Sequence, residues 1–284
     1  MNSKKIGIVG LGLIGGSLGL DLYQKGHYIV GISRSQETCT RAMERKACHQ
    51  ASPDLKLLLN DVDLIFLCTP IGSIVPTLET ISSELSPSTI VTDVASVKVE
   101  IVQKCSAIWS NFVGGHPMAG TAFMGIEAAQ YNLFKNAPYV LTPIENTPSQ
   151  SLECLKNIIA QLGSIPYITT PEEHDCAVAW ISHLPVIVGA ALLESIDSNA
   201  PSNILELAQK LASTGFKDTT RVGGGNPELG LMMAQYNREA ILDSLTKYQQ
   251  VLQEITDLIR QQNWDALEDI LHKSQASRPY FLKD

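Results

Sequence analysis

The sequence lacks an excess of basic residues. Its 284 residues include 21 Lys and Arg against 29 Asp and Glu, which gives a formal net charge of −8 at pH 7. A protein that binds nucleic acid or an anionic membrane surface through its overall field needs the opposite sign. We therefore expect neither partner, and we expect an acidic ligand to be held by a few locally placed cations.

Metal-binding patterns are also missing. The cysteines are scattered, with no CxxC pair and no Cys/His spacing that suits zinc. They are Cys39, Cys48, Cys68, Cys105, Cys154 and Cys176. This usage is typical of reduced thiols in a cytoplasmic protein and predicts no metal site.

Long apolar runs are absent as well. No segment reaches about 18 uninterrupted apolar residues, the length that spans a bilayer. Residues Met1 to Lys5 lead directly into a strand-like run and not into the apolar stretch of a signal peptide. We expect a cytoplasmic protein that is neither exported nor membrane-spanning.

The order of elements predicts an α/β domain followed by an all-α domain. Up to residue 170, short β-rich runs alternate with helical stretches, the pattern of a mostly parallel sheet. The expected strands are Lys5–Val9, Tyr28–Ile32, Leu64–Cys68, Ile90–Thr92, Phe112–Gly114, Tyr139–Thr142 and Ile165–Ile168. The remaining chain is helix-like, except for a glycine-rich interruption at 223–227. The predicted domains are therefore 1–170 and 171–284.

One long helix of the second domain has a regular apolar face. Its apolar residues recur at steps of four and three. They are Ile241, Leu245, Tyr248, Leu252, Ile255 and Ile259. This spacing is typical of a helix packed lengthwise on another helix. The partner helix can belong to the same chain or to a second copy, and the spacing leaves both open.

A glycine loop stands at the start of the first domain. Gly10-Leu11-Gly12-Leu13-Ile14-Gly15 follows the strand ending at Val9 and opens a helix expected to run to Lys25. The glycines permit a tight turn, a close approach to a pyrophosphate and close helix–strand packing, and the helix N-terminus favours phosphate. In this context the motif predicts a dinucleotide site over a purely structural turn. The expected cofactor contacts are Gly10, Gly12, Leu13, Ile14 and Gly15.

The tip of the second strand favours NADP over NAD. An acidic residue there would hold the ribose 2′-hydroxyl of NAD. The tip instead reads Ser33-Arg34-Ser35, and no carboxylate appears before Glu37. Arg34 can stack on adenine or pair with a 2′-phosphate, and the two serine hydroxyls can donate to that phosphate. The alternative is an exposed arginine with no role.

Three loops follow expected parallel strands at the edge where an open sheet binds its ligand. They carry Thr69-Pro70, Ser96 and His116. On spacing alone, a role for Ser96 as the N-cap of the next helix is favoured over a catalytic role, because serine fills that position very often. His116 stands between glycines and Pro117 on a constrained turn, and histidine suits the removal of a hydroxyl proton near neutral pH. We favour His116 as a base over a structural role.

The helical domain offers two further polar side chains. His183 lies two residues before Pro185, which cannot donate to the carbonyl of Ile181 and is expected to bend the helix. Both a pocket-lining role and a hydrogen-bonded core role for His183 stay open. Arg221 precedes the glycines at 223–225, where it can face solvent or bind a carboxylate bidentately.

Together these segments resemble the prephenate/arogenate dehydrogenase family, in particular its short cyanobacterial-type arogenate dehydrogenases. The similar motifs span nearly the whole chain. They are GLGLIGGS at 10–17, LCTP at 67–70, DVASVK at 93–98, GGHPMAG at 114–120, NAPYVLTP at 136–143, AWISHLP at 179–185 and DTTRVGGGNPELG at 218–230. Each motif alone is modest evidence, but their order and spacing are specific.

The resemblance implies a Rossmann-type NADP domain followed by a helical domain that forms a homodimer. It implies oxidative decarboxylation of arogenate to tyrosine, with hydride transfer to NADP, loss of CO2 and aromatisation of the ring. His116 would help deprotonate the C4 hydroxyl, Ser96 would bridge hydroxyl and nicotinamide, and Arg221 would hold the ring carboxylate. His183 would line the substrate pocket, and Thr69-Pro70 would line the nicotinamide site.

Three alternatives stay open. Many prephenate-preferring relatives carry an acid just after the HPMAG run, whereas residues 121–125 of this chain are Thr-Ala-Phe-Met-Gly. The direction of the preference does not follow from these residues, so a prephenate dehydrogenase giving 4-hydroxyphenylpyruvate is the first alternative. Another NADP-linked hydroxy-acid dehydrogenase is the second. The third is a nucleotide-binding sensor without chemistry, and the presence of Ser96, His116 and Arg221 argues against it.

Overall fold

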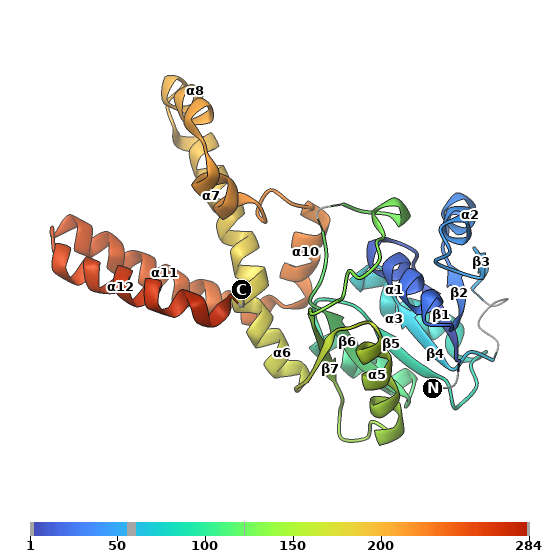
Figure 1. Cartoon of the computed structure of the whole chain (residues 1–284). Coiled ribbons are helices and arrows are strands. Elements are labelled where there is room, and N and C mark those ends of the chain that lie inside the picture. The colour runs from blue at the N-terminus through green and yellow to red at the C-terminus, as the bar shows by residue number, and fades with distance from the viewer. Residues whose placement is uncertain (1–2, 56–60, 122, 283–284) are drawn as a thin grey trace. The chain divides into compact units, whose positions relative to one another are not determined.

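The computed structural model describes residues 3–55, 61–121 and 123–282 (Figure 1). The chain divides into two compact units, residues 1–237 and 238–284. Residue 122, in the segment after the HPMAG run, lies outside the described residues. A domain boundary at residue 170 stays a prediction.

An eight-stranded sheet forms the centre of the first unit, in the order β3-β2-β1-β4-β5-β6-β7-β8. The strands are β1 (Lys5–Val9), β2 (Tyr28–Ile32), β3 (Gln50–Ser52), β4 (Leu64–Leu67), β5 (Ile90–Asp93), β6 (Phe112–Pro117), β7 (Pro138–Thr142) and β8 (Ile165–Ile168). Neighbouring strands pair in parallel, except for β6 with β7. The predicted mostly parallel α/β sheet is confirmed. The short edge strand β3 was not predicted, because its three residues lack an apolar pattern.

Helices cover both faces of the sheet. Helices α1 (Leu13–Gln24), α2 (Gln36–Glu44) and α5 (Ser149–Gln161) contribute to one buried apolar cluster, together with Ile6, Ile29 and Phe66 of the strands. Helices α3 (Ile71–Ser82) and α4 (Val99–Ile108) contribute to the other, together with Val9, Ile65 and Val91. Because both faces of the central strands are buried, their sequences are apolar at nearly every position.

Strand β6 extends three residues beyond its predicted end. The prediction that it stops at Gly114 and that His116 lies in a following loop is wrong. Residues Gly114 to Pro117 pair antiparallel with β7, and His116 stands opposite Val140. A Cβ at Gly115 would lie 2.7 Å from the carbonyl oxygen of Asp93, so glycine lets this part of the strand approach the end of β5. His116 is therefore held by sheet hydrogen bonds and not by a turn.

Helices follow the sheet, as predicted. The first unit continues with α6 (Pro171–Val178), η2 (Ala179–His183), α7 (Leu184–Asn199), α8 (Ser202–Leu211), α9 (Thr214–Thr220) and α10 (Pro227–Tyr236). The glycine-rich interruption separates α9 from α10. The expected irregularity before Pro185 takes the form of a π-helical turn, η2, because proline cannot supply the regular backbone hydrogen bond.

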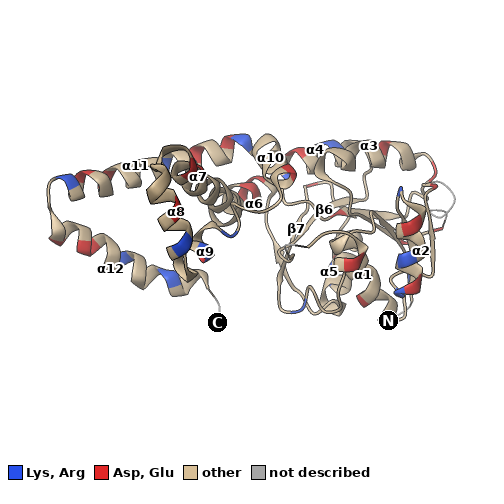
Figure 2. Ribbon diagram, turned by 90° about the horizontal axis from the view of Figure 1, so that it is seen from above, with Lys and Arg blue, Asp and Glu red and all other residues tan. Residues whose placement is uncertain are grey.

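The second unit is a helical hairpin of α11 (Arg238–Arg260) and α12 (Trp264–Phe281), which contact each other. The predicted apolar face lies on α11. Ile241 is buried, whereas Leu252 and Ile259 remain about half exposed in the single chain. Acidic and basic residues are interspersed along both helices (Figure 2).

Residues Pro171–Asn199 form one helical run that is long and apolar enough to cross a membrane by length and composition. Among the described residues it is the single helix that meets both criteria. Core helices of soluble proteins also meet them, so this finding alone is weak evidence for a membrane span. Its polar His183 is 1% exposed and hydrogen-bonded within the first unit.

Candidate active site

Gly10 and Gly15 are glycines because the fold leaves no room for side chains. Gly10 follows β1 with a φ of +103°, and a Cβ there would lie 2.5 Å from the carbonyl oxygen of Cys68. A Cβ at Gly15 would lie 2.0 Å from the carbonyl oxygen of Gly10. Gly12 differs, because its φ is −87° and a Cβ would meet no described atom within 4 Å. Packing within the chain therefore does not require glycine at position 12.

The open space beside Gly12 fits a bound phosphate. Gly12 is the N-cap residue of α1, no side chain caps this helix, and its first turn carries no acidic residue. The backbone N–H groups of the first turn, including those of Leu13 and Ile14, therefore direct partial positive charge toward that space. The residues present fit the pyrophosphate of a dinucleotide, which would approach the backbone at Gly12.

The tip of β2 presents Arg34 without an ion-pair partner among the described residues. Arg41 and Arg45 of the following helix are engaged with the segment around η1 (Ile126–Ala128): Arg41 pairs with Glu127, and Arg45 donates to the carbonyl of Ile126. The exposed Arg34 has no such contact and remains available to a ligand.

The flanking serines of the β2 tip cap the local backbone. Ser33 Oγ accepts from Ser35 N at 3.4 Å, and Ser35 Oγ accepts from Thr38 N at 3.2 Å as the N-cap of α2. Both hydroxyls act as acceptors in these bonds, so their protons remain available to a ligand oxygen.

His116 lies at the end of a buried chain of hydrogen bonds. Its Nδ1 lies 2.8 Å from Nε2 of His174, and His174 Nδ1 lies 2.7 Å from Oδ1 of Asp175. All three residues are buried: His116 is 8% exposed, and His174 and Asp175 are 2% and 3% exposed. These hydrogen bonds connect β6 to α6, so the sheet and the first helix beyond it jointly position the His116 ring.

The surroundings of His116 favour its neutral form. Burial is the largest cause that lowers the pKa of His116 well below its ordinary value, and positive charge on His174, Lys98 and His183 would lower it further. Lys98 itself is fully buried, forms an ion pair with Asp93 and donates to the carbonyl of Gly115 at 2.8 Å. A neutral imidazole at this position can act as a base at neutral pH.

His183 presents a buried N–H group without a partner. Asn237 Nδ2 donates to the carbonyl oxygen of Asp175 at 2.8 Å, which fixes the orientation of the amide. The same Nδ2 lies 3.1 Å from His183 Nδ1, which must therefore accept. The hydrogen of the neutral ring then resides on Nε2, which is buried without a hydrogen-bond partner in the described chain. Burial lowers the pKa of His183 to about 4, so the ring is neutral at pH 7.

Among the buried hydroxyls that have no hydrogen-bond partner in the described chain, two directly follow parallel strands at their carboxyl ends. They are Thr69 Oγ1, after β4, and Ser96 Oγ, after β5. Ser96 does not cap α4, because the N-cap residue of that helix is Lys98. Pro70 is exposed and precedes α3. Buried polar groups are normally hydrogen-bonded, so these orphaned hydroxyls indicate a polar ligand at this edge of the sheet.

Arg221 lies apart from the histidines in the hydrogen-bond network. It follows α9 at the start of the glycine-rich turn, its side chain is exposed, and it forms no ion pair with a described residue. The hydrogen bonds therefore link His116 to His183 through His174, Asp175 and Asn237, whereas Arg221 has no ion-pair partner among the described residues.

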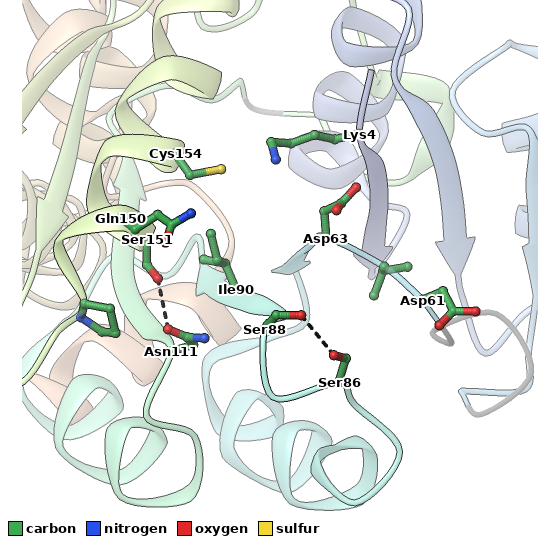
Figure 3. Close-up of a pocket in the computed structure, with 12 residues that line it drawn as sticks. Lys4, Asp61, Asp63, Ser86, Ser88, Ile90, Asn111, Gln150, Ser151 and Cys154 are labelled. Atoms are coloured by element: carbon green, nitrogen blue, oxygen red, sulfur yellow. Dashed lines mark hydrogen bonds between the residues drawn. The ribbon is translucent and has the colours of Figure 1, made fainter. Parts of the chain in front are cut away.

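The opposite edge of the sheet carries a polar cavity of about 510 Å³ (Figure 3). Lys4, Asp63, Ile90 and Asn111 line it at the amino ends of β1, β4, β5 and β6. Ser151 of α5 donates to Asn111 Oδ1 at 3.0 Å across one wall. Open parallel sheets bind their ligands at the carboxyl ends of the strands, so this cavity is not the candidate active site.

Comparisons with known proteins assign the chain to a family. Residues 18–175 match the model described as "Prephenate dehydrogenase, nucleotide-binding domain", and residues 170–273 match "Prephenate dehydrogenase, dimerization domain". The chain belongs to the prephenate dehydrogenase family. The resemblance identified from the sequence is confirmed, and the chain is an oxidoreductase of the prephenate/arogenate dehydrogenase type.

Several members of this family are similar over nearly the whole chain. The chain is 31% identical to the prephenate dehydrogenase of Bacillus subtilis (strain 168), over 94% of this chain and 74% of that protein. The solved structure of Synechocystis arogenate dehydrogenase is 54% identical, with a TM-score of 0.88 over 98% of this chain and 100% of that one. Prephenate dehydrogenase from A. aeolicus, solved with hydroxyphenyl propionate and NAD+, is 26% identical with a TM-score of 0.93 over 99% of each chain.

Three polar residues that this chain places next to His116 and His183 were not predicted from the sequence. His174, Asp175 and Asn237 form the buried links between His116 and His183. His174 and Asp175 stand side by side in a helix, where the apolar pattern gave no reason to single them out. A buried acid next to a buried histidine is a signal of a functional site. The burial of these two residues, however, becomes visible only once α6 is placed against α4.

Proposed function

We propose that this chain oxidatively decarboxylates arogenate to tyrosine with NADP. The observation that supports arogenate is the similarity to the Synechocystis arogenate dehydrogenase, which exceeds half of the aligned residues and covers both chains almost completely. The curated prephenate dehydrogenases are less than one third identical. Prephenate is the alternative substrate, and it differs from arogenate in carrying a pyruvyl side chain in place of an aminoacyl one.

The residues of the chain supply a base, hydrogen-bond donors and a carboxylate site. His116 Nε2 takes the proton of the C4 hydroxyl, and Ser96 Oγ hydrogen-bonds to that hydroxyl. The C4 hydrogen leaves as a hydride, for which NADP, when bound, would be the acceptor. Arg221 pairs with the ring carboxylate and orients it. When the bond from C1 to the carboxyl carbon breaks, CO2 leaves, the electron pair of that bond enters the ring, which becomes aromatic, and the C4 oxygen takes a proton back from His116. His183 Nε2–H donates to an oxygen of the substrate.

NADP rather than NAD is favoured by the β2 tip. Arg34 is exposed and free of ion pairs, and the hydroxyl protons of Ser33 and Ser35 are available. A charge-assisted hydrogen bond contributes about 1.5–3 kcal/mol, so an Arg34→Ala variant should bind NADP roughly 10- to 100-fold more weakly. Its affinity for NAD should change much less, because NAD lacks the 2′-phosphate. Equal weakening of both cofactors would remove the support for NADP.

We also propose a cytoplasmic homodimer, with a nucleotide-binding part up to residue 170 and a substrate and dimerisation part beyond it. The family model of the dimerization domain begins at residue 170. Within a single chain, Ile204, Leu207 and Leu211 on α8 are about half exposed or more. A second copy would bury such a surface. Analytical ultracentrifugation tests this proposal, and a monomer at micromolar concentration would contradict it.

The central experiment measures the initial rate of reduced cofactor formation with arogenate and with prephenate, each offered NADP and NAD. We expect rapid turnover with arogenate and NADP, together with release of CO2. A His116→Ala variant should bind NADP normally and lose most of kcat, by about 100-fold or more. Turnover of prephenate alone would replace the substrate and retain the mechanism. Turnover of another hydroxy acid without CO2 would overturn the proposal.

A further inference from the structure

His174 and Asp175 stand between the proposed base and the start of α4. His174 contacts His116 on one side and Asp175 on the other, at 2.8 and 2.7 Å. We propose that His174 and Asp175 are positioning residues that fix the tautomer of His116 and accept part of the positive charge that develops on it. This inference rests on the proposed role of His116 as the base.

The direction of the hydrogen bonds follows from Asp175. A carboxylate only accepts hydrogen bonds, so His174 Nδ1 must carry the hydrogen shared with Asp175 Oδ1. In a neutral His174 the lone pair then lies on Nε2. The partner of that lone pair, His116 Nδ1, must donate. Neutral His116 therefore has its hydrogen on Nδ1 and its lone pair on Nε2, the atom that faces away from this chain of bonds.

Asp175 is itself held in place by the backbone of α4. Its Oδ1 accepts from Lys98 N at 2.7 Å, and its Oδ2 accepts from Val99 N at 2.9 Å. These donors are backbone groups at a helix N-terminus, where partial positive charge stabilises a carboxylate. These bonds keep Asp175 as a hydrogen-bond acceptor, and helix α4 fixes the orientation of its carboxylate.

The geometry also provides for the proton that His116 receives. The hydroxyl O–H bond breaks, a bond forms to His116 Nε2, and the ring becomes positively charged. Its Nδ1–H can then pass to His174 Nε2, while His174 retains its Nδ1–H bond to Asp175. One proton moves at each step and no electrons are exchanged. The positive charge comes within hydrogen-bond distance of a carboxylate and does not stay isolated in a buried site.

Other charged and titratable groups surround this chain of bonds. They are Asp93 at the end of β5 and its partner Lys98 at the start of α4, His183 on η2, Tyr139 on β7 and Cys68 directly after β4. Lys98 and Asp93 form a buried ion pair, so their charges largely offset each other. Asp175 is consequently the anion placed to stabilise a protonated histidine pair.

The alternative is that Asp175 only caps α4 and His174 only fills space. Ring ¹⁵N chemical shifts distinguish the two directly, without any need for turnover. The chain contains six histidines, so selective ¹⁵N-histidine labelling of the full protein with NADP bound gives an assignable spectrum. We expect His116 and His174 both to be protonated at Nδ1 and not at Nε2. A His116 ring protonated at Nε2 in the neutral wild-type protein would overturn the proposal.

Variants at the two positions separate orientation from simple packing. In His174→Gln the amide can accept from His116 and donate to Asp175, whereas His174→Leu can do neither. We expect His174→Leu to lower kcat by about 100-fold, and His174→Gln to retain at least ~10-fold more activity than His174→Leu. Both variants should keep the wild-type affinity for NADP. Equal kcat values in the two variants would contradict an orienting role.

The pH profile of Asp175→Asn gives a readout that a purely structural role would not move. Removing the negative charge destabilises the protonated form of the His116–His174 pair. The acidic limb of kcat against pH should therefore shift to lower pH, and the maximal kcat should fall. Glu173→Gln in the same helix is the matched control, because it makes the same acid-to-amide change at an exposed residue. Its profile should match wild type. If Asp175→Asn lowers kcat at every pH without shifting the limb, the proposal is wrong.

Loss of the proposed activity and loss of the positioning role would give different experimental results. If wild type turns over neither arogenate nor prephenate, the proposed function is wrong, and the ¹⁵N shifts still decide the tautomer. If wild type is active and the ¹⁵N shifts and pH limb contradict the expected pattern, the function stands and the positioning role is rejected.

Discussion

Asn237 and His183 form a buried hydrogen bond of 3.1 Å in which the amide donates and the ring Nδ1 accepts. The amide is oriented by its second bond, to the carbonyl of Asp175, so the two bonds together decide which nitrogen of His183 carries the hydrogen. His183 therefore carries a buried N–H donor on Nε2 without a partner in the described chain, and its acceptor atom is already occupied. A substrate oxygen suits this arrangement, whereas a substrate ammonium does not.

Removing the Asn237 amide should affect both stability and substrate binding. In Asn237→Ala the carbonyl of Asp175 and the Nδ1 of His183 each lose a donor in a buried site, which costs about 1–3 kcal/mol. We expect a lower free energy of unfolding and a higher KM, because His183 can then adopt either tautomer. Chemical denaturation and initial rates measure the two effects.

Asn199→Ala is the matched control for that variant. The amide of Asn199 also donates to a backbone carbonyl, that of Ser195 at 2.9 Å, but the residue is exposed at the end of α7. Its loss should change the free energy of unfolding by less than about 0.5 kcal/mol. Similar losses in the two variants would show that the buried network contributes nothing specific.

Neutral His183 should make stability depend on pH. The unfolded chain binds this proton near pH 6.5, whereas burial lowers the pKa in the folded chain to about 4. The stability associated with neutral His183 is thus fully present above pH 6.5 and is lost as pH falls to about 4. Since one pKa unit corresponds to about 1.4 kcal/mol, the loss is about 3 kcal/mol at most. His183→Asn should flatten the pH dependence of unfolding in this range.

The control for the pH experiment is an exposed histidine. His272 lies on α12 with 68% of its side chain exposed. His272→Asn should leave the pH dependence of unfolding as in wild type. If His183→Asn follows wild type equally closely between pH 6.5 and 4, the buried neutral state assigned to His183 is wrong.

The fold was largely predictable because its signals are local. The β1 strand, the glycine loop and Gly26, which ends α1 with a φ of +83°, follow from neighbouring residues alone. The length of β6 did not follow, because residues Gly114 to Pro117 are strand only through pairing with β7, which lies more than twenty residues on. His174 and Asp175 were missed for the same reason. Their roles depend on contacts with β6 and α4 that no local pattern encodes.

The two glycines Gly10 and Gly12 should respond oppositely to alanine. Gly10→Ala places a Cβ 2.5 Å from a backbone oxygen at a φ of +103°, so the protein should be strongly destabilised. Gly12→Ala meets no described atom within 4 Å at an ordinary φ, so it should fold with unchanged stability. It should nevertheless bind NADP at least ~10-fold more weakly, because the added methyl group occupies the space assigned to the pyrophosphate. Thermal unfolding and a cofactor titration measure the two outcomes.

Gly215→Ala serves as the control for the glycine pair. A Cβ there also meets no described atom within 4 Å, but the residue lies in α9 and not in the glycine loop. It should leave NADP affinity unchanged and stabilise the helix by up to about 1 kcal/mol. Wild-type cofactor affinity in Gly12→Ala would mean that the pyrophosphate does not approach the backbone at this position.

Arg221 should bind the substrate and not the cofactor. Its guanidinium is exposed and forms no ion pair with a described residue, so it is free to take a carboxylate in two parallel hydrogen bonds. Because a charge-assisted hydrogen bond contributes about 1.5–3 kcal/mol, Arg221→Ala should raise KM by about 10- to 100-fold. The dissociation constant of NADP should stay within about twofold of the wild-type value. Arg221→Lys keeps the charge and loses the bidentate geometry, so it should recover only part of the loss.

Lys217→Ala is the control, because it removes a cation from α9, the helix that Arg221 directly follows. It should change neither KM nor the dissociation constant of NADP. Equal weakening of substrate and NADP in Arg221→Ala would place this arginine at the cofactor and reassign the carboxylate of the substrate to another cation.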